Sequence, residues 1–428
     1  MFNKKYIPAK VFLCVIFLFM FLALLAAVWR KTNKILHADE FKNYAEIDID
    51  WEKLYPFSEH EKIELNKKRP LSKSEKIHEY ITKRSEEYTT EKMPGYMKIV
   101  ELVRKYEKFI TWNMSSVFTY NDVIELEGGY LTGFRPSLDI TPIIKSTVDF
   151  AKFCDENNIE FIYVQAPGKI CKYDDIKITN ILDFTNQRAD DLLNGLQMAK
   201  IKNYDLREFL HDERKNHHDA FYKTDHHWKT QTGLWAARHV LRILHQDLNW
   251  PVDENILNTE NFEFDTYYDC FLGSQGKKLT LVRAKPEDFT LIRPKFSTSF
   301  HFEIPNILLN TSGDFEITYS HEGIKNMQGM YSSLFLGDNP LAKLTNLNAT
   351  NDINVLLVKN SFSNCLVPFL TMGVKKIDAI DMRHFTGSIK NYIKNNKTDI
   401  VIILYHTDFI RSPAEQELMN TRWMFDFR

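Results

Sequence analysis

Two aspartates and four histidines gather in a short stretch near the middle of the chain. Asp225, His226 and His227 lie within "FYKTDHHW". Three further titratable residues precede them: His217, His218 and Asp219. These side chains could bind a metal ion, form part of a catalytic triad, or lie in a solvated turn before a helix.

The spacing of these residues argues against a metal site. The sequence has no H-E-x-x-H motif, and no cysteine joins the group. Adjacent histidines in an extended segment point in opposite directions, so they do not easily bind one ion. We therefore expect no metal ion and no other cofactor.

A serine that could act as a nucleophile follows 134 residues after His227. Ser361 comes after the apolar "VLLV", with only Lys359 and Asn360 between, and a helix is predicted to begin about three residues later. A serine in such a turn exposes its hydroxyl beside free helix N–H groups, which could stabilise an oxyanion. The sequence is not a G-x-S-x-G elbow, however, and Ser361 or Ser363 could simply cap the helix.

A serine nucleophile needs a base, and the base needs a group that orients it. Asp225 and His227 are two residues apart, so in an extended segment they point the same way. Asp225 could then accept a hydrogen bond from one ring nitrogen of His227 while the other nitrogen faces Ser361. His226 would point elsewhere. The alternative is a solvated turn before the helix.

Other residues could bind the oxyanion or the substrate. "FLGSQGKK" (271–278) could be a plain turn, or Gly273 could offer its backbone N–H to an oxyanion. No strand and helix are predicted to frame it as in a P-loop. Lys169 and Arg383, at predicted strand ends, could bind an anionic or sugar substrate or could be ordinary rim charges. Two more candidates lie at strand ends: Asn360 and Tyr405.

Short apolar strands alternate with helices over much of the chain. Strands are predicted in "IEFIYVQAPGK", near 201–204, and in "INVLLVK", "KKIDAIDMR" and "DIVIILYHTDF". The helices are predicted from Thr141 to about Asn157, in 188–199, from about Thr230, after Ser361 and in "GSIKNYIKNNK". This pattern predicts an α/β fold, a three-layer, doubly wound parallel sheet whose strand ends form the ligand-binding edge. Residues 250–350 lack clear helices and are predicted to be an irregular insertion or extra strands. "NDVIELEGGYLTG" predicts a β-hairpin.

The amino terminus has a different character. Residues 11–28, "VFLCVIFLFMFLALLAAV", carry no charge, and as a helix they would span about 27 Å. We predict a leader and transmembrane signal anchor over 1–30, a charged helical stem over 31–117 and a catalytic domain over 118–428. A cleaved signal peptide or a cytoplasmic body on a membrane tether are the alternatives, since the flanking charges do not fix the orientation.

Charge and cysteine content narrow the function further. After residue 30 the chain has 51 Lys and Arg residues, four fewer than the whole chain, against 57 Asp and Glu residues, a net charge of −6. This argues against a general nucleic-acid binder, which needs a basic face. The five cysteines show neither metal-ligand spacing nor a disulfide framework, so buried free thiols are expected, with one disulfide possible.

Several of these stretches together resemble a known family. "FYKTDHHWKTQTG" resembles the motif that names the DHHW family, which comprises membrane-anchored relatives of the alginate O-acetyltransferases AlgX and AlgJ with an SGNH hydrolase-like domain. "GDNPLAKLTN", "LLVKNSFSN", "IDMRHF" and "TDIVIILYHTD" fit the same family in the same order, and "EGGYLTG" and "YVQAPGK" match its amino-terminal half. The resemblance extends from about residue 40 to the end.

The resemblance implies a Ser-His-Asp triad formed by Ser361, His227 and Asp225, in a chain order that is the reverse of that in most SGNH hydrolases. Triads are recognised by geometry and role, so this order is no objection. The chain departs from the family at Asn360, where an Asp usually precedes the nucleophile. Asn is nearly isosteric with Asp, but the missing charge alters the local electrostatics.

The expected function follows from the resemblance. It is an extracytoplasmic O-acyltransferase, specifically an O-acetyltransferase, anchored in the cell membrane by one helix and acting on hydroxyls of a cell-surface or secreted polysaccharide. The acyl donor would be supplied by a polytopic membrane acyltransferase. Two alternatives remain: a glycan acetylesterase, and a catalytically silent binding or scaffold component of a polysaccharide export complex.

Overall fold

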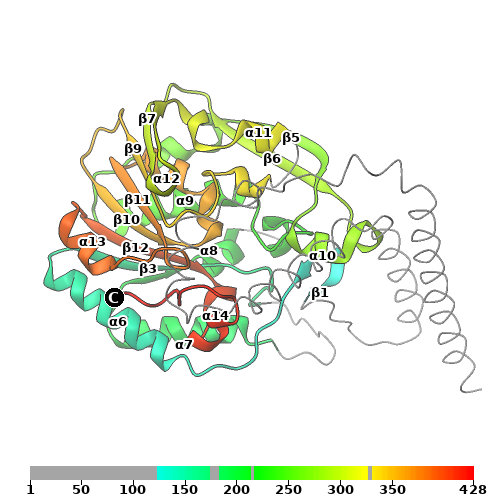
Figure 1. Cartoon of the computed structure of the whole chain (residues 1–428), viewed down its shortest axis with the longest axis horizontal. Helices are drawn as coiled ribbons and strands as arrows, with labels where there is room; N and C mark the ends of the chain where they lie inside the picture. Colours follow the sequence, from blue (N-terminus) through cyan, green and yellow to red (C-terminus); the bar gives the residue numbers. More distant parts are fainter. Residues whose placement is uncertain (1–122, 174–182, 214–215, 326–329) are drawn as a thin grey trace, which may run out of the picture. The chain divides into compact units, whose positions relative to one another are not determined.

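The computed structural model describes residues 123–173, 183–213, 216–325 and 330–428 (Figure 1). The predicted membrane helix at 11–28, the stem at 31–117 and the boundary between stem and catalytic domain lie outside these residues. None of the helices in the described ranges has both the length and the apolar character needed to cross a membrane.

An eight-stranded sheet forms the centre of the fold, in the order β4-β3-β12-β10-β11-β9-β7-β8. The first five strands are parallel to one another. They are β4 (Asn203–Asp205), β3 (Glu160–Ala166), β12 (Ile400–His406), β10 (Asn354–Lys359) and β11 (Lys376–Asp381). The strands predicted from apolar stretches are therefore confirmed, and they form one parallel unit.

The parallel strands other than the edge strand β4 are buried on both faces, which explains their continuous apolar sequences. All residues of β10 and β12 are buried. Successive side chains of a strand point to opposite faces, so Leu357 and Leu404 pack into one hydrophobic core while Leu356 and Ile403 pack into the other. Two cores on one sheet make the three layers that the sequence predicts.

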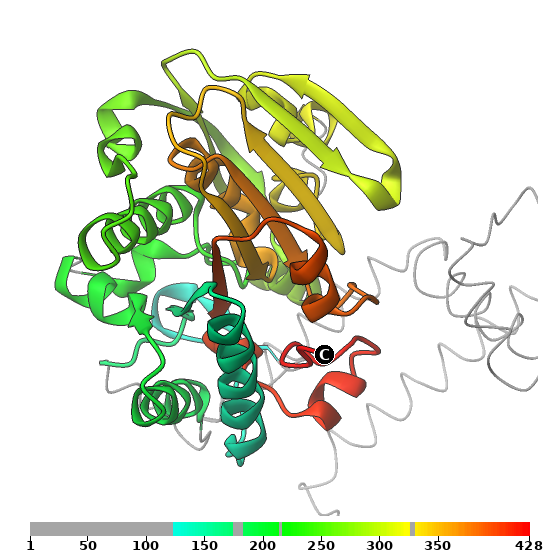
Figure 2. The ribbon, with the colours of Figure 1, turned by 90° about the vertical axis from the view of Figure 1, so that its left-hand side faces the viewer.

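Helices cover each face of the sheet (Figures 1 and 2). The helices on one face are α8 (Leu206–Glu213), α9 (Thr230–Arg242) and α12 (Val367–Met372). Those on the other face are α6 (Thr141–Glu156), α7 (Thr185–Met198) and α13 (Ile389–Asn395). The helices predicted from Thr141 and from about Thr230 begin at these residues.

The prediction of a purely parallel sheet needs correction, because residues 250–350 contribute strands to it. The sequence predicts either an irregular insertion or extra strands for this segment, and the structure shows extra strands. Three of them extend the sheet in antiparallel order: β9 (Leu341–Asn346), β7 (Phe300–Ile304) and β8 (Leu309–Gly313). A separate antiparallel pair consists of β5 (Phe262–Phe271) and β6 (Glu287–Pro294), linked by α10 (Ser274–Arg283).

The strands β7 and β9 lack continuous apolar runs, so their sequences do not identify them as strands of the central sheet. In β7 and β9 buried residues alternate with partly exposed ones, as expected for strands covered mainly on one face.

The carboxyl ends of the parallel strands lie together at one edge of the sheet. Lys359 at the end of β10 pairs with Asp381 at the end of β11, and His406 at the end of β12 pairs with Ala166 at the end of β3. The predicted hairpin is also present, as β1 (Ile124–Glu125) and β2 (Leu131–Thr132) joined through Gly128 and Gly129, both at positive φ. The edge where ligands bind in such sheets is therefore where Ser361 follows β10.

The cysteines in the described ranges fit the prediction of free thiols. Cys154 and Cys365 are buried free thiols, and Cys270 is a partly exposed one. Burial raises the pKa of Cys154 and of Cys365 to about 12, so both thiols stay protonated at neutral pH.

Candidate active site

Ser361 opens a short 3-10 helix directly after β10. This helix, η11, spans Ser361–Cys365, and the Asn360 side chain caps it by accepting a hydrogen bond from the Phe362 N–H (3.1 Å). Ser363, the alternative cap, does not serve as one: its Oγ is buried and has no hydrogen-bond partner among the described residues. The Ser361 hydroxyl is thus left available for another role.

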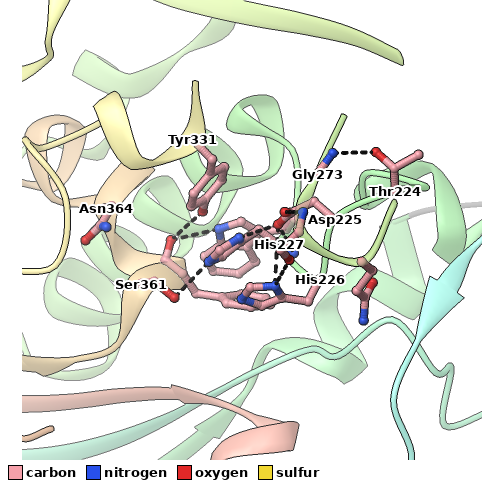
Figure 3. Close-up of polar contacts among 12 residues, drawn as sticks. Thr224, Asp225, His226, His227, Gly273, Tyr331, Ser361 and Asn364 are labelled. Atoms are coloured by element: carbon pink, nitrogen blue, oxygen red, sulfur yellow. Dashed lines mark hydrogen bonds and ion pairs between the residues drawn. The ribbon is translucent and has the colours of Figure 1, made fainter. Parts of the chain in front are cut away.

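The DHHW segment brings His227 to this hydroxyl (Figure 3). The His227 Nε2 atom lies 2.7 Å from Ser361 Oγ, and its Nδ1 atom lies 2.5 Å from Asp225 Oδ1. Because an ionised carboxylate only accepts hydrogen bonds, Nδ1 carries the proton and Nε2 offers its lone pair to the serine. The structure therefore brings together the three residues that the sequence analysis proposes as a triad: Ser361, His227 and Asp225.

Backbone and side-chain contacts fix the segment against the nucleophile turn. Tyr222 N–H donates to His227 O (3.2 Å), closing a tight loop around Asp225. The Trp228 indole Nε1–H donates to the Phe362 carbonyl (2.9 Å), one residue after Ser361. The two halves of the site are therefore bonded to each other through the backbone of η11.

The turn at Gly273 holds Asp225 rather than an oxyanion. The Gly273 N–H is already bound to Thr224 Oγ1 (2.9 Å), and a Cβ at this position would lie 2.2 Å from the Asp225 Cβ. The next N–H, from Ser274 at the start of α10, donates to Asp225 Oδ2 (2.6 Å). The prediction that Gly273 N–H faces a substrate oxyanion therefore needs correction: this N–H binds the Thr224 hydroxyl, and the neighbouring Ser274 N–H binds the Asp225 carboxylate.

Asp225 is held in its ionised form. Burial alone would raise the pKa of Asp225, but the neighbouring His227 and His226 rings and the Ser274 N–H hold it well below its ordinary value. The carboxylate therefore stays charged at all pH values at which the protein would be assayed, ready to stabilise a positive charge on His227.

Lys169 supports the same loop and does not face a substrate. It is 3% exposed, and its ammonium donates to the carbonyls of Asp225, Leu131 and Lys223 and to Gln275 Oε1. Burial lowers the pKa of Lys169 to about 7, against the opposing effect of the Asp225 charge. The predicted substrate-binding role is therefore replaced by a structural one, since all its donors have partners.

Two other residues predicted to bind the substrate, Arg383 and Tyr405, bond to other partners and not to Ser361. Arg383 binds the carboxylates of Asp381 (2.5 Å) and Asp338 (2.9 Å). Tyr405 is fully buried in the core on the opposite face of the sheet, where its hydroxyl donates to the Met424 carbonyl (2.9 Å). Both residues contribute to the framework of the fold.

Two rings that the sequence analysis did not assign lie against His227 (Figure 3). The Tyr331 ring stacks on His227 at a centroid distance of 3.8 Å and an interplanar angle of 15°, and the His226 ring lies at the same distance with a tilt of 37°. His226, expected to point elsewhere, also contacts Ser274 Oγ (2.9 Å) and remains 32% exposed. Adjacency to His227 was its only sequence signal, and Tyr331 had none.

Two groups of side chains have the proximity that metal ligation needs. They are Asp225 with His226 and His227, and Asp338 with Asp381 and His384. In the first group, both ring nitrogens of His227 are already bonded to Asp225 and Ser361. In the second group the carboxylates face the cations of Arg383 and Lys359. Hydrogen bonds and ion pairs therefore already engage the His227 ring in the first group and both carboxylates in the second. His217, also considered as a ligand, bonds through Nε2 to the Gly168 carbonyl (2.8 Å).

Comparisons with known proteins find one family that matches part of the chain. Residues 147–265 match the family described as "SGNH hydrolase-like domain, acetyltransferase AlgX". The match includes Asp225 and His227, and it ends before Ser361. No curated protein sequence gives a significant match to the chain.

Solved structures share the fold. PatB1 from Bacillus cereus is 20% identical, with a TM-score of 0.57 over 73% of this chain and 99% of that chain. PatB1 with a sulfonyl adduct is 19% identical, with a TM-score of 0.56 over 73% of this chain and 98% of that chain. A DHHW family protein from Eubacterium siraeum is 16% identical, with a TM-score of 0.54 over 70% of this chain and 94% of that chain. The predicted resemblance is thereby supported: residues 147–265 match the AlgX family of SGNH hydrolase-like domains, and the fold is α/β with a mostly parallel central sheet.

Proposed function

We propose that the protein is a serine O-acyltransferase that moves acetyl groups onto hydroxyls of a cell-surface or secreted polysaccharide. One observation carries the proposal: Ser361 Oγ, the His227 ring and the Asp225 carboxylate form a continuous hydrogen-bonded chain at the ligand-binding edge of the sheet. A nucleophile within hydrogen-bond reach of an oriented base is the arrangement that acyl transfer requires. The acetyltransferase description of the matching family supports the choice of acyl group.

In the first half of the reaction, Ser361 Oγ attacks the carbonyl carbon of the acyl donor. His227 Nε2 takes the hydroxyl proton, and the resulting imidazolium keeps its Nδ1–H on Asp225. The tetrahedral intermediate then collapses, the bond to the leaving group breaks, and His227 returns the proton to that group. The product is an acetyl ester on Ser361.

In the second half, a sugar hydroxyl takes the place of the leaving group. His227 Nε2 accepts the proton of this hydroxyl while its oxygen attacks the serine ester. Collapse of the second intermediate restores the Ser361 hydroxyl with the proton held by His227. If water attacked instead, the same groups would produce an esterase.

The oxyanion needs a donor that is not already bonded. Gly273 N–H and Phe362 N–H both have acceptors, and the Asn364 amide uses one of its two N–H groups to bind Asp338 Oδ1 (2.9 Å). The Ser361 N–H lies at the first position of η11, where helix N–H groups have no partner within the helix. We assign the oxyanion contact to this backbone N–H.

The proposal extends to the setting of the reaction. The body of the protein would lie outside the cytoplasm on the predicted anchor at 11–28. A polytopic membrane acyltransferase would deliver the acetyl group to Ser361, because small acyl donors of the cytoplasm do not otherwise reach that side.

The test uses the purified full-length protein with a chromogenic acetyl ester and an oligosaccharide acceptor. Wild-type protein is expected to release the chromophore and to yield acetylated sugar, detected by mass spectrometry. Ser361→Ala is expected to abolish both, whereas Ser363→Ala, which changes a buried hydroxyl in the same short helix, retains them.

Two results would contradict the proposal. Full activity in Ser361→Ala would exclude the serine nucleophile, and release of acetate without acetylated sugar across a panel of polysaccharide fragments would favour an esterase. A sulfonyl fluoride is a suitable second probe, since PatB1, which shares the fold, has been solved with a sulfonyl adduct.

A further inference from the structure

A second histidine lies beside the nucleophile turn and takes no part in the proposed reaction. His406 is the last residue of β12, and it is 1% exposed. Its Nδ1 atom lies 2.8 Å from the Nδ2 atom of Asn360, the residue before Ser361. Its ring also stacks on Phe362, the residue after Ser361, at a centroid distance of 3.8 Å and an interplanar angle of 13°. His406 therefore touches both neighbours of the nucleophile.

The hydrogen bonds determine which nitrogen of His406 carries the proton. The Asn360 Oδ1 atom accepts from the Phe362 backbone N–H, so the amide cannot be turned round without losing the cap of η11. Its Nδ2 atom must then donate toward His406 Nδ1, which has to accept through a lone pair. The proton of a neutral His406 ring consequently resides on Nε2.

The surroundings of His406 favour this neutral form. The nearest carboxylate oxygen, Asp408 Oδ2, is 3.7 Å from Nε2, beyond hydrogen-bond distance. Burial lowers the pKa of His406 to about 4 in spite of Asp408, and the nearby His227 and Arg411 lower it further. The ring thus keeps its Nδ1 lone pair at neutral pH.

We propose that His406 is a positioning residue for the nucleophile. Its neutral ring, protonated on Nε2, accepts a hydrogen bond from the Asn360 amide through Nδ1. This bond fixes the turn at 360–362 so that Ser361 Oγ lies within hydrogen-bond distance of His227. Asn360 and His406 then form a matched donor and acceptor. An Asn side chain suits this position, because its N–H donates to the lone pair of His406 Nδ1. The effect on reactivity rests on the proposed serine chemistry, whereas the position of the proton does not.

The kinetic test compares two variants that both remove the ring stacked on Phe362. His406→Asn offers an amide oxygen close to the place of Nδ1, whereas His406→Leu offers no acceptor. The reporter is acylation of Ser361 by a fluorophosphonate, in which Oγ bonds to phosphorus, fluoride leaves and the hydroxyl proton passes to His227. Misplacement of a nucleophile by an ångström costs about 10²-fold in rate.

We expect His406→Leu to react roughly 10- to 100-fold more slowly than wild type, and His406→Asn to stay within about fivefold of it, in line with that cost. Thermal melts should place the two variants at similar stability. Equal rates in the two variants, or a wild-type rate in His406→Leu, would overturn the positioning role.

A spectroscopic test is independent of catalysis. Nitrogen-15 NMR of full-length protein labelled at histidine should show His406 with an unprotonated Nδ1 and a protonated Nε2. Asn360→Asp replaces the donor by an acceptor, and the proton should then appear on Nδ1. A wild-type Nδ1 that already carries a proton overturns the inference even if the protein folds and reacts normally. Failure of the wild type to react with the fluorophosphonate would instead sink the proposed function and leave the NMR result standing.

Discussion

Two histidine–aspartate pairs flank the nucleophile turn, and they differ in how the two partners meet. In the first pair, His227 contacts the Asp225 carboxylate at 2.5 Å and turns its other nitrogen to Ser361. In the second pair, His406 lies 3.7 Å from Asp408 and turns its other nitrogen to Asn360. Both histidines are buried.

The difference shows that a buried His–Asp pair does not by itself make a base. Contact between Asp225 and Nδ1 leaves the Nε2 lone pair pointing at a hydroxyl that can give up its proton. The lone pair of His406 accepts a hydrogen bond from an amide, which does not give up its proton, so His406 holds the turn and does not act as a base. The group that donates a hydrogen bond to the unprotonated ring nitrogen therefore distinguishes the two histidines. For His227 it is the Ser361 hydroxyl, and for His406 it is the Asn360 amide.

The largest effect should come from exchanging one aspartate at a time. Asp225→Asn no longer favours the productive tautomer of His227, and kcat should fall by about 10³- to 10⁴-fold, as for other triads. Asp408→Asn removes a charge that lies 3.7 Å from His406 but is not within hydrogen-bond distance of it, and kcat should change less than about threefold. Steady-state rates on an acetyl ester would measure both, and similar losses in the two variants would erase the distinction drawn here.

A smaller effect is expected when an added methyl group is placed against each of the two His–Asp pairs. Gly273→Ala would place a Cβ 2.2 Å from the Asp225 Cβ and 2.5 Å from its Cα, so the backbone of the loop must move, and kcat should drop by about 10²-fold. Gly168→Ala would meet Thr407 Oγ1 at 2.2 Å, next to His406, but a side-chain hydroxyl can rotate away. Its kcat should stay within about tenfold of wild type. Calorimetry would check that both variants fold, and a greater kinetic loss for Gly168→Ala would speak against the account of Gly273.

Removing an aromatic neighbour of each histidine should have a still smaller effect. Tyr331→Leu deletes the ring stacked on His227, which would support the imidazolium through its π face, and kcat should fall about tenfold, equivalent to about 1.4 kcal/mol. Phe409→Leu deletes a ring 4.7 Å from His406 and should lower stability more than kcat. A Tyr331→Leu variant with unchanged kcat in stopped-flow acylation would remove Tyr331 from the site.

The smallest effect concerns the dependence of stability on pH. The pKa of His406 is lowered to about 4 in the folded protein, against about 6.5 when unfolded, so between these values the unfolded chain binds more protons. The free energy of unfolding should therefore rise as pH increases from about 4 to 6.5. Denaturant titrations should show a shallower rise in His406→Asn, by up to about 1.4 kcal/mol per pH unit, the limit for one proton. An unchanged slope would mean that His406 titrates normally.

Local rules were sufficient to name the central residues of the site as candidates, and the resemblance to the DHHW family joined them into a triad. Asp225 and His227 lie two apart in an extended segment, and Ser361 follows a buried strand, so spacing and sheet topology allow their juxtaposition but leave a helix cap or a solvated turn as alternatives. The helices at Thr141 and Thr230 and the five parallel strands likewise follow from apolar periodicity.

Roles that depend on how each donor is satisfied could not be read in this way. Gly273 and Lys169 are expected from the sequence to bind an oxyanion or a substrate, but their N–H groups are bonded to Thr224 and to loop carbonyls, which only the folded structure reveals. Tyr331 reaches His227 from a segment with no chemical motif. The alternating sequence of β9 resembles a surface strand, although it extends the central sheet.

The position of β12 has a consequence for how the protein folds. This strand comes last in the chain but lies between β3 and β10, and the Gln165 side chain donates to Tyr405 O across a separation of 240 residues. Contacts this distant in sequence form slowly, because the intervening loop must close first. The segments that carry Lys169 and Ser361 flank a gap in the sheet until β12 has been synthesised. The site therefore assembles late. On the ribosome, every proposed catalytic residue would be synthesised before β12, and the residues could be brought together only after β12 has joined the sheet.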